Sequence, residues 1–405
     1  MGSTSSVGVL KRAWYRIYQF GFNLGKYCLI WPWPQLLSGA GSVRELPELI
    51  ASHGVSKPLV VTGPNITKRC LPDGLYAALR ERGIECEIYS KTEANPSIEN
   101  VEEALELYIA GGCDGIIAFG GGSPMDCAKA VGARVVNPKK NVSAMAGFFK
   151  VGRKLPPFFA VPTTAGTGSE TTIAAVITDR KLHRKFAIGD LRLLPLVAVL
   201  DCELTAQLPA NITAATGMDA LTHAVEAYVN QWSGATDEAS VEAIELVFQY
   251  LPRAYTNGQD FEAREKMLVA SYKAGIAFTR SCVGYVHAIA HTLGGFYGLA
   301  HGLANAVLLP VVLELYGKSA HAPLAKLADA VHLAGETEAQ KAQAFIEAIR
   351  SMNAAMGIPN GFDCIRDEDM PTMVRYALAE ANPTYPVPEI WGEREIRAAI
   401  DRIRI

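Results

Sequence analysis

The sequence predicts an α/β domain built on a parallel sheet, followed by an all-α domain. The chain has 405 residues, more than a single core usually serves, because domains commonly span roughly 100–200 residues. From about Leu37, short apolar runs alternate with segments of helical periodicity, which is typical of β–α units. Beyond residue 204 long helical patterns replace the apolar runs. We therefore expect an N-terminal extension at 1–36, an α/β domain at 37–204 and a helical domain at 205–405.

Each expected element follows from a local pattern. Apolar runs that end at glycine or polar residues predict buried strands, at 58–62, 85–89, 115–119, 157–161 and 197–200. Ser97 is a suitable N-cap for a helix that reaches Ala110. In the second half, helical spacing predicts helices at 214–232, 237–250, 261–277, 283–294, 303–316 and 338–356.

Composition and charge exclude several classes of protein. Hydrophobic residues make up 49% and charged residues 20% of the chain, as in ordinary globular proteins. The formal net charge is −3, whereas nucleic-acid binding normally requires a basic face. Eight cysteines occur without a CxxC pair, which predicts free thiols in a reducing compartment and hence a cytoplasmic location.

The N-terminal extension combines aromatic and basic residues between Lys11 and Pro34. Its longest apolar run is far shorter than the ~20 residues of a spanning helix, so we expect no integral membrane segment. Two interpretations stay open: an arm that packs on its own domain or a partner subunit, or a segment that lies on a membrane surface. The opening residues 1–6 fit a myristoylation pattern, but also an ordinary Gly–Ser-rich start.

A glycine run, 120–122, connects the strand predicted at 115–119 to a helix. Glycines let the backbone approach a phosphate, and a helix N-terminus offers free N–H groups. We expect Ser123 to be the N-cap, Pro124 the first helical residue and Asp126 part of the first turn. The motif is not GxGxxG, so a plain tight turn remains an alternative.

A second polar loop, 162–170, follows the strand predicted at 157–161. Its threonine and serine hydroxyls suit ribose, phosphate or a carboxamide, although a solvated loop would have a similar composition. Ligands of open α/β sheets bind at the carboxyl ends of the strands. Together the two loops predict a dinucleotide-binding domain.

The helical half contains a cluster of metal-type residues in apolar surroundings. Asp219 and His223 are four residues apart and therefore share a helix face, His287 and His291 repeat this spacing, and His301 follows. Separate buried histidines are the alternative, but each unpaired polar group would cost ~1–3 kcal/mol on burial. One carboxylate with imidazoles suits Fe²⁺ or Zn²⁺. With an open position, such an ion would polarise an alcohol or aldehyde oxygen.

These motifs resemble those of the iron-containing (group III) alcohol dehydrogenase family. The similarity runs from about residue 37 to the C-terminus and rests on several motifs in order: GGGSPMDCAK (120–129), PTTAGTGSE (162–170), GMDALTHAVEAY (217–228), the set His287, His291 and His301, and ALAEANPTYPVPEI (377–390). The resemblance implies a dehydroquinate synthase-like fold. It also implies an alcohol dehydrogenase, or aldehyde reductase, that transfers hydride between NAD(P) and a small primary alcohol or aldehyde.

The resemblance also implies the site residues. The metal ligands are Asp219, His223, His287 and His301, and His291 is a catalytic residue that assists substrate binding or proton transfer. The cofactor contacts are Gly63, Asn95, Gly121, Gly122, Ser123, Asp126, Thr163, Thr164, Thr167 and Lys185. We expect a homo-oligomer, a dimer or larger, because the aromatic arm favours association.

One departure from the family concerns the cofactor. NAD-preferring members carry Val-Thr-Asp after the first strand, whereas this chain has Val61-Thr62-Gly63. Without that carboxylate a 2′-phosphate is admissible and Lys68 or Arg69 is placed to pair with it, so NADP is slightly favoured over NAD.

Other functions remain as alternatives. A glycerol-dehydrogenase-like polyol dehydrogenase and a non-catalytic metal-binding protein fit the same motifs. A dehydroquinate synthase activity is disfavoured, because few Lys or Arg residues lie in the predicted metal helices.

Overall fold

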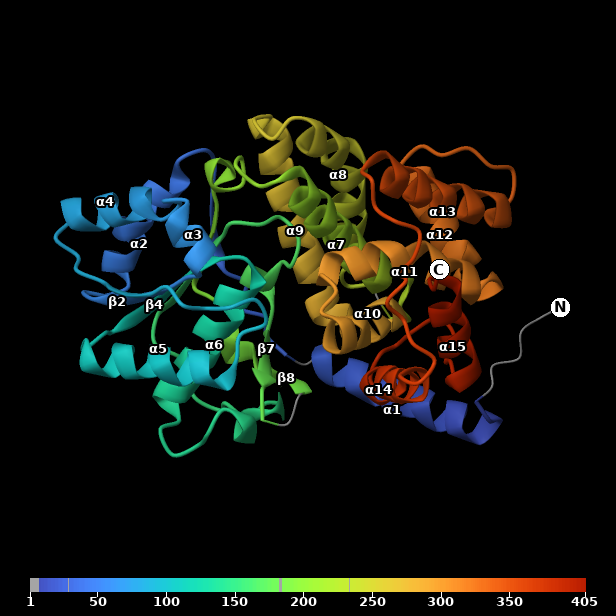
Figure 1. Ribbon diagram of the computed structural model, residues 1–405, viewed down its shortest axis with the longest axis horizontal. Coiled ribbons are helices and arrows are strands. Elements are labelled where there is room, and N and C mark those ends of the chain that lie inside the picture. Colours follow the sequence, from blue (N-terminus) through green and yellow to red (C-terminus); the bar gives the residue numbers. More distant parts are fainter. Residues whose placement is uncertain (1–6, 28, 182–183, 233) are drawn as a thin grey trace. The chain divides into compact units, whose positions relative to one another are not determined.

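The computed structural model describes residues 7–27, 29–181, 184–232 and 234–405 (Figure 1). The chain forms two compact units. The α/β unit comprises 31–208 and 258–272, and the helical unit comprises the chain up to Ile30 together with 209–257 and 273–405. Relative to the predicted boundaries, residues 31–36 and 258–272 belong to the α/β unit, and most of the N-terminal extension belongs to the helical unit.

The α/β unit contains a six-stranded parallel sheet in the order β1-β9-β6-β4-β2-β3. The strands are Gln35–Ser38 (β1), Val197–Leu200 (β9), Phe158–Pro162 (β6), Gly115–Gly120 (β4), Pro58–Val61 (β2) and Glu87–Tyr89 (β3). All five predicted strands are present, and β1 adds an edge strand that the apolar runs did not predict. β2, β4, β6 and β9 are buried along their whole length, because both faces of the sheet are covered.

Alternate residues of each central strand enter two different cores. Ile116 and Ala118 of β4 pack with helices α5 (Ile98–Ala110) and α6 (Gly122–Val136). Ile117 and Phe119 pack on the opposite face, against a cluster that includes Leu46 of α2 (Leu46–Ser52) and Leu75 of α4 (Asp73–Glu81). The period of two along a strand sends successive side chains to opposite faces, so this is a doubly wound sheet (Figure 1).

The helix that follows the glycine run begins earlier than predicted. Gly121 is its N-cap and α6 starts at Gly122, so Ser123 is the second helical residue and Pro124 the third. Proline is still compatible with this position, because the first N–H groups of a helix have no intrahelical partner. The predicted N-cap at Ser97 is correct: its hydroxyl accepts from Asn100 N, and the Asn100 side chain accepts from Ser97 N.

A small second sheet, β5-β8-β7, was not predicted. It consists of Gly147–Phe148 (β5), Ala174–Asp179 (β7) and Arg184–Gly189 (β8). β7 and β8 are antiparallel. Every second residue of β7 is buried, so one face of the strand is covered and the other is only partly covered. β7, which belongs to the long connection between β6 and β9, makes contact with α6.

The helical unit packs its helices around α7 (Ala210–Val229) and α11 (His301–Tyr316). The others are α8 (Asp237–Thr256), α10 (Tyr285–Tyr297), α12 (Lys318–Ala330), α13 (Glu338–Ala355), α14 (Met370–Ala381) and α15 (Glu393–Arg402), with the last part of α9 (Phe261–Ser281). The sequence did not predict α12, α14 or α15. Among the described residues, no helix combines the length and apolarity needed to cross a bilayer.

The N-terminal extension forms a helix, α1 (Val9–Tyr27), that packs on the helical unit. Arg16 donates to the carbonyl oxygens of Val387 and Pro388 at 2.8 and 2.9 Å. Gln19 donates to Tyr385 O at 2.7 Å. The arm thus packs within its own chain through polar side chains, as the first of the two open interpretations expects, while its apolar side chains Leu10, Trp14 and Ile17 stay exposed. Met1–Ser6, which carry the myristoylation pattern, lie outside the described residues.

Candidate metal centre and dinucleotide loops

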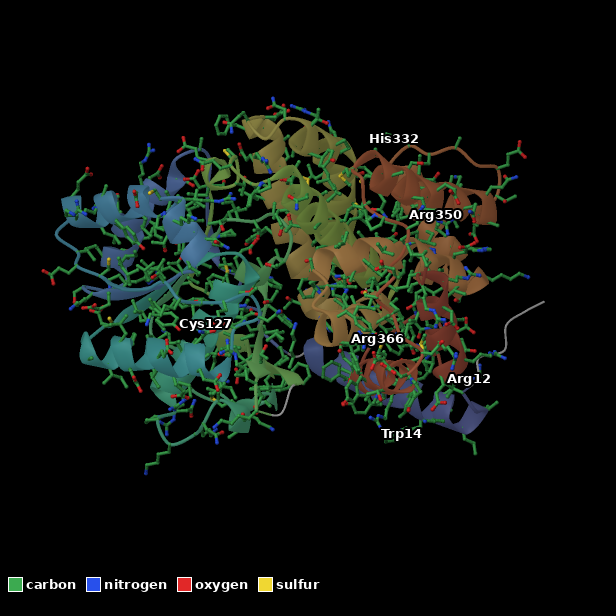
Figure 2. The ribbon with its side chains drawn as sticks, viewed as in Figure 1. Arg12, Trp14, Cys127, His332, Arg350 and Arg366 are labelled. Atoms are coloured by element: carbon green, nitrogen blue, oxygen red, sulfur yellow. The ribbon has the colours of Figure 1, made fainter. Side chains whose placement is uncertain are left out.

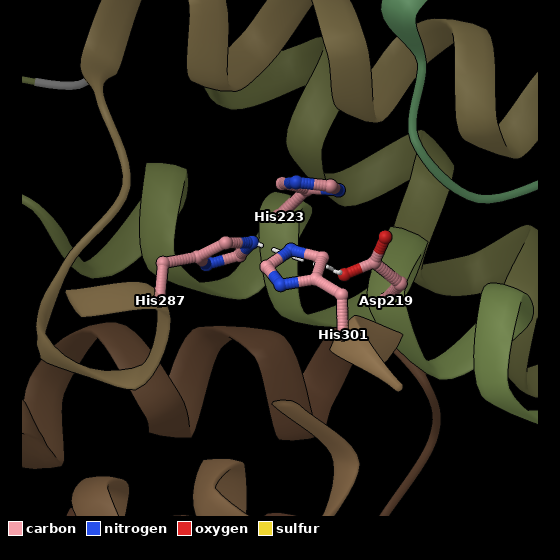
Figure 3. A group of neighbouring side chains, drawn as sticks. All are labelled: Asp219, His223, His287 and His301. Atoms are coloured by element: carbon pink, nitrogen blue, oxygen red, sulfur yellow. Dashed lines mark ion pairs between the residues drawn. The ribbon is translucent and has the colours of Figure 1, made fainter. Parts of the chain in front are cut away.

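Four side chains of the helical unit bring their ligand atoms together. One atom each of Asp219, His223, His287 and His301 lies within 4.8 Å of the other three (Figure 3). The His301 and His287 Nε2 atoms lie 3.5 and 3.8 Å from Asp219 Oδ1. These are the four residues that the family resemblance implies as ligands, and they come from α7, α10 and α11.

Local sequence explains the convergence. Asp219 and His223 are one turn apart on α7, so they share a face. Gly302 follows His301, and a Cβ at that position would overlap the backbone of Ala215. Only glycine therefore lets the start of α11 approach α7 so closely. The His223 ring stacks between Phe278 and His287, at centroid distances of 4.1 and 4.5 Å.

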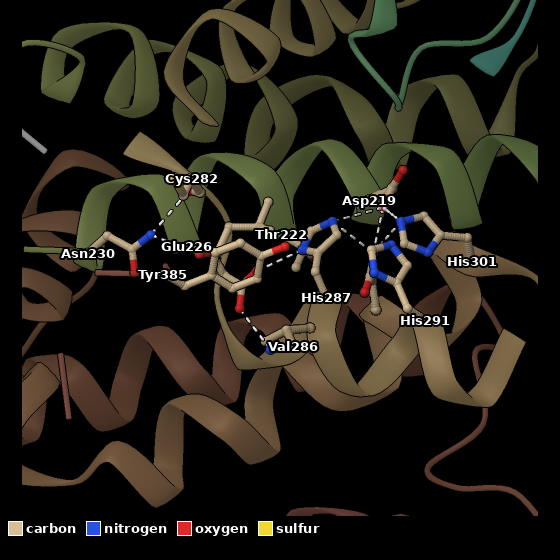
Figure 4. Close-up of polar contacts among 12 residues, drawn as sticks. Asp219, Thr222, Glu226, Asn230, Cys282, Val286, His287, His291, His301 and Tyr385 are labelled. Carbon is tan, nitrogen blue, oxygen red and sulfur yellow. Dashed lines mark hydrogen bonds and ion pairs between the residues drawn. The ribbon is translucent and has the colours of Figure 1, made fainter. Parts of the chain in front are cut away.

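His287 is oriented by a carboxylate that the sequence did not single out. Its Nδ1 lies 2.6 Å from Glu226 Oε2, while Glu226 Oε1 accepts from Val286 N at 2.8 Å (Figure 4). With Nδ1 engaged, Nε2 is the atom that faces Asp219. Burial first, and then the neighbouring imidazoles His223, His301 and His291, lower the pKa of His287 well below its usual value. The ring is therefore neutral, as a metal ligand must be.

Asn305 marks the point on which the ligand atoms converge. Its amide nitrogen donates to Asp219 Oδ1 at 2.7 Å and lies 3.1 Å from Nε2 of both His287 and His301. One carboxylate oxygen and two imidazole nitrogens thus surround a single electropositive group. A donor set of this kind, completed by His223, fits a divalent transition metal ion.

One side of the cluster is open. Asp219, His223 and His287 are buried, whereas the side chains of His301 and His291 are 39% and 35% exposed. His291 is outside the four-residue group, but its ring stacks on His301 at a centroid distance of 5.0 Å. Three buried candidate ligands and one accessible side are typical of a catalytic metal site, which keeps a coordination position open.

His291 is itself anchored by a pair of residues from the C-terminal part of the chain. Its Nδ1 lies 2.8 Å from Glu380 Oε1, and Tyr385 OH donates to the same oxygen at 3.0 Å. Both residues fall in the motif 377–390, but sequence reasoning gave neither a role. Their arrangement fixes the orientation of the exposed imidazole.

In the α/β unit the two polar loops lie against each other at the carboxyl ends of β4 and β6. Thr163 N donates to Gly120 O at 3.1 Å. A Cβ on Gly121 would lie 3.1 Å from Thr164 Oγ1, and one on Gly122 would lie 3.1 Å from Thr167 Cγ2. The threonine loop therefore packs against the glycine run, and α6 begins at Gly122, which carries no side chain.

Three further predicted residues form one hydrogen-bonded group beside this loop. Asn95, with a positive φ of 60°, donates from its backbone N to Ser123 Oγ at 3.2 Å. Lys185 Nζ donates to Asn95 Oδ1 at 2.7 Å. Burial lowers the pKa of Lys185. The group places a cation close to the N-terminus of α6.

Asp126 is partly buried and participates in a network that the sequence did not predict. Its carboxylate accepts from Ser169 Oγ at 3.2 Å and Val176 N at 3.1 Å. Nearby, the fully buried Lys129 donates to Ser169 O and Thr172 O at 2.7 and 2.9 Å. Lys129 thus ties the end of the threonine loop to α6. Burial lowers the pKa of Lys129 to about 8 and raises that of Asp126 to about 6.

Gly63 follows β2 and lies in the same α/β unit. It is buried, has extended backbone angles (φ −118°, ψ 160°) and caps the short helix α3 (Pro64–Lys68). Lys68 and Arg69 are exposed at the end of that helix. Arg69 Nη1 donates to Gln207 O at 3.1 Å, so one of its N–H groups is engaged within the unit.

Paired loops on a doubly wound sheet, together with an Asp–His₃ cluster that is open on one side, define the class of metal-dependent dehydrogenases. Two family profiles match the chain: "Iron-containing alcohol dehydrogenase" over residues 34–202 and "Fe-containing alcohol dehydrogenase family, C-terminal" over 213–403. The chain belongs to the iron-containing alcohol dehydrogenase family. It is accordingly an NAD(P)-dependent alcohol dehydrogenase.

Individual relatives agree with this placement. Alcohol dehydrogenase 4 of Schizosaccharomyces pombe is 40% identical over 358 residues, which cover 86% of this chain and 84% of the relative. The NAD-dependent methanol dehydrogenase of Bacillus methanolicus is 36% identical over 352 residues, with coverages of 86% and 92%. A solved structure of a 1,3-propanediol oxidoreductase has a TM-score of 0.88 and 37% identity, covering 91% of this chain and 98% of the other. The fold and the family predicted from the sequence are thus confirmed.

Proposed function

We propose that the protein interconverts a small primary alcohol and its aldehyde with a divalent metal held by Asp219, His223, His287 and His301. The observation that carries the proposal is the convergence of these four ligand atoms within 4.8 Å of one another. When bound, Fe²⁺ or Zn²⁺ supplies a Lewis acid for the substrate oxygen, and the nicotinamide exchanges the hydride. The relatives named for methanol and 1,3-propanediol support a small primary alcohol as substrate.

The chain's own residues have distinct tasks in this proposal. Glu226 holds His287 by Nδ1 and leaves Nε2 for the metal, as carboxylates commonly do for histidine ligands. His291 is exposed beside the cluster and is anchored on Glu380, so we assign it the exchange of the hydroxyl proton. The neutral state of His287 preserves its lone pair at neutral pH.

We assign the dinucleotide to the loops of the α/β unit. The predicted contacts are Gly63, Asn95, Gly121, Gly122, Ser123, Asp126, Thr163, Thr164, Thr167 and Lys185. The N-terminus of α6, which begins at Gly122, supports a pyrophosphate there, because helix N-terminal N–H groups and the helix dipole favour anions. Asp126 and Lys129 act on this site through the loop that they hold.

We propose a slight preference for NADP over NAD. Position 63 carries no side chain that would repel a 2′-phosphate, and Lys68 and Arg69 are exposed one helix turn away. We further propose that the protein is cytoplasmic, since all seven described cysteines are free. A homo-oligomer, a dimer or larger, remains a proposal.

The test begins with metal-free protein, reconstituted separately with Fe²⁺ and with Zn²⁺. Oxidation of a series of short primary alcohols is then followed at the nicotinamide absorbance with NAD and with NADP. We expect turnover only after metal addition, with the highest kcat/KM for short unbranched alcohols. Equal turnover before and after metal addition would contradict the proposed metal chemistry. A strong preference for NAD would contradict only the cofactor assignment.

A further inference from the structure

Helix α1 presents an apolar surface to the outside of the helical unit. Its exposed residues include Leu10, Trp14 and Ile17, whose exposed fractions are 87%, 58% and 65%. At 3.6 residues per turn, the apolar residues occupy about half of the circumference, and no charged residue lies among them. We call this surface the outer face of α1; its large side chains are Val9, Leu10, Trp14, Ile17, Tyr18, Phe20 and Leu24.

The polar side of the same helix is turned toward the protein. Gln19 is buried, and both Arg16 and Gln19 donate to backbone carbonyl oxygens of the segment 385–388. An amphipathic helix on a globular protein normally buries its apolar stripe and exposes its charges. In α1 the apolar side is exposed and the polar side faces the protein. The hydrogen bonds of Arg16 stabilise this orientation. In Figure 2, Trp14 accordingly projects away from the neighbouring helices.

The charge of α1 indicates what covers the outer face. The helix carries Lys11, Arg12, Arg16 and Lys26 and no acidic residue, although the whole chain has a net charge of −3. We propose that α1 lies flat on a lipid bilayer with anionic headgroups, its outer face inserted at the boundary between headgroups and acyl chains. Helices that bind in this way combine an apolar face rich in aromatic residues with lysine and arginine on the other.

A second copy of the chain is a poorer occupant. Pairing of two outer faces about a twofold axis would offer Lys11, at the edge of the face, no acidic group from the partner's α1, because α1 carries none. A bilayer with anionic lipids attracts the positive charges of α1. Trp14 and Tyr18 suit the headgroup region, where aromatic residues are enriched. Exposed Lys11, at the edge of the outer face, can extend its ammonium group to the phosphates.

Because α1 precedes the residues that match the family profiles, binding to a bilayer can be separated from catalysis. Both family profiles begin after α1, the first at residue 34. α1 contributes no residue to the metal cluster or to the dinucleotide loops. We therefore expect the bilayer to bind the folded enzyme without changing its turnover of a soluble alcohol.

The experiment is co-sedimentation of the full chain with vesicles of phosphatidylcholine alone and of equal parts phosphatidylcholine and phosphatidylserine. The variant Leu10→Gln/Trp14→Gln/Ile17→Gln removes apolar area but keeps helix propensity. The matched control is Ile109→Gln/Tyr376→Gln/Ile405→Gln, which removes three exposed apolar residues elsewhere. Alcohol oxidation by each variant verifies that the fold is intact.

We expect the wild type and the control to bind the anionic vesicles, more weakly as salt rises. The partition coefficient of the α1 variant should fall at least about tenfold. Equal binding by the α1 variant and the control would overturn the proposal. Absence of binding by the wild type would overturn it too. So would an α1 variant that loses only self-association in sedimentation velocity, since a second copy would then be the occupant.

Discussion

The Glu226 carboxylate lies 2.6 Å from Nδ1 of His287, and both side chains are almost completely buried. The pair lies in the buried part of the helical unit, and His287 is one of the four residues of the metal cluster. The pair fixes which imidazole nitrogen is available as a ligand, because the other is engaged.

The first prediction concerns this pair. Glu226→Gln keeps the shape of the side chain but removes its charge, so His287 loses the partner that orients it and makes it a better ligand. We expect the affinity for the metal to fall by roughly 10–100-fold, measured by competition with a chelator. Glu380→Gln is the matched control, since it affects a histidine outside the ligand group and should retain the metal. Unchanged affinity in Glu226→Gln would argue against its orienting role.

Substitution of His291 should lower the catalytic rate without loss of the metal. His291→Ala is expected to keep the metal and to lower kcat by roughly 10²–10⁴-fold if the imidazole transfers the proton. Glu380→Gln should lower kcat less, because the imidazole remains but is no longer anchored. Kinetics and elemental analysis on the same preparations test both. Full activity in His291→Ala would remove this residue from the mechanism.

Gly63 should determine the cofactor preference. Gly63→Asp is expected to lower kcat/KM for NADP and to raise it for NAD, because the carboxylate bonds a ribose hydroxyl and repels a 2′-phosphate. Its Cβ would lie 3.1 Å from Thr92 O, so a small local shift accompanies the change. Gly63→Asn meets the same contact without the charge and is the control. If both variants change the ratio of the two kcat/KM values equally, the effect is steric.

Glu170 should make stability depend on pH. Burial raises the pKa of its carboxyl from 4.5 to about 7, and its Oε1 has no hydrogen-bond partner among the described residues. A raised pKa means that the stabilisation is complete below pH 4.5 and is lost as the pH rises through about 7. Glu170→Gln should therefore match the wild type near pH 4 and exceed it by up to about 3 kcal/mol at pH 8. Urea unfolding at the two pH values measures the difference, and a constant difference would contradict the assignment.

The sequence predicted the central strands because burial on both faces makes them continuous apolar runs. β1 was not predicted, since it has only two apolar residues, which lie between Gln35 and Ser38. The strand is largely exposed at the edge of the sheet. The antiparallel pair β7 and β8 was not predicted, although residues 173–177 form an apolar run. α1 was not predicted as a helix, although Leu10, Trp14, Ile17 and Leu24 have helical spacing, because that apolar face is not covered by the fold.

Some residues of the site could be predicted from the sequence and others could not, depending on whether their contacts are local in the chain. Ligands four residues apart, such as Asp219 and His223, share a helix face and are visible in sequence. Asn305 lies four residues after His301 on α11, so the same rule would have indicated it. Glu380 contacts His291, and Tyr385 contacts Glu380, only because the helical unit brings α14 and the segment after it to α10. No local pattern gives such a contact.

The central claim is that Asp219, His223, His287 and His301 bind one metal ion. The most direct test is the metal content of the purified wild type and of His287→Ala, with dinucleotide binding measured on both by titration. The account predicts one ion per chain in the wild type, loss of the metal in His287→Ala, and similar dinucleotide affinity in the two proteins. Full metal content in His287→Ala would contradict it.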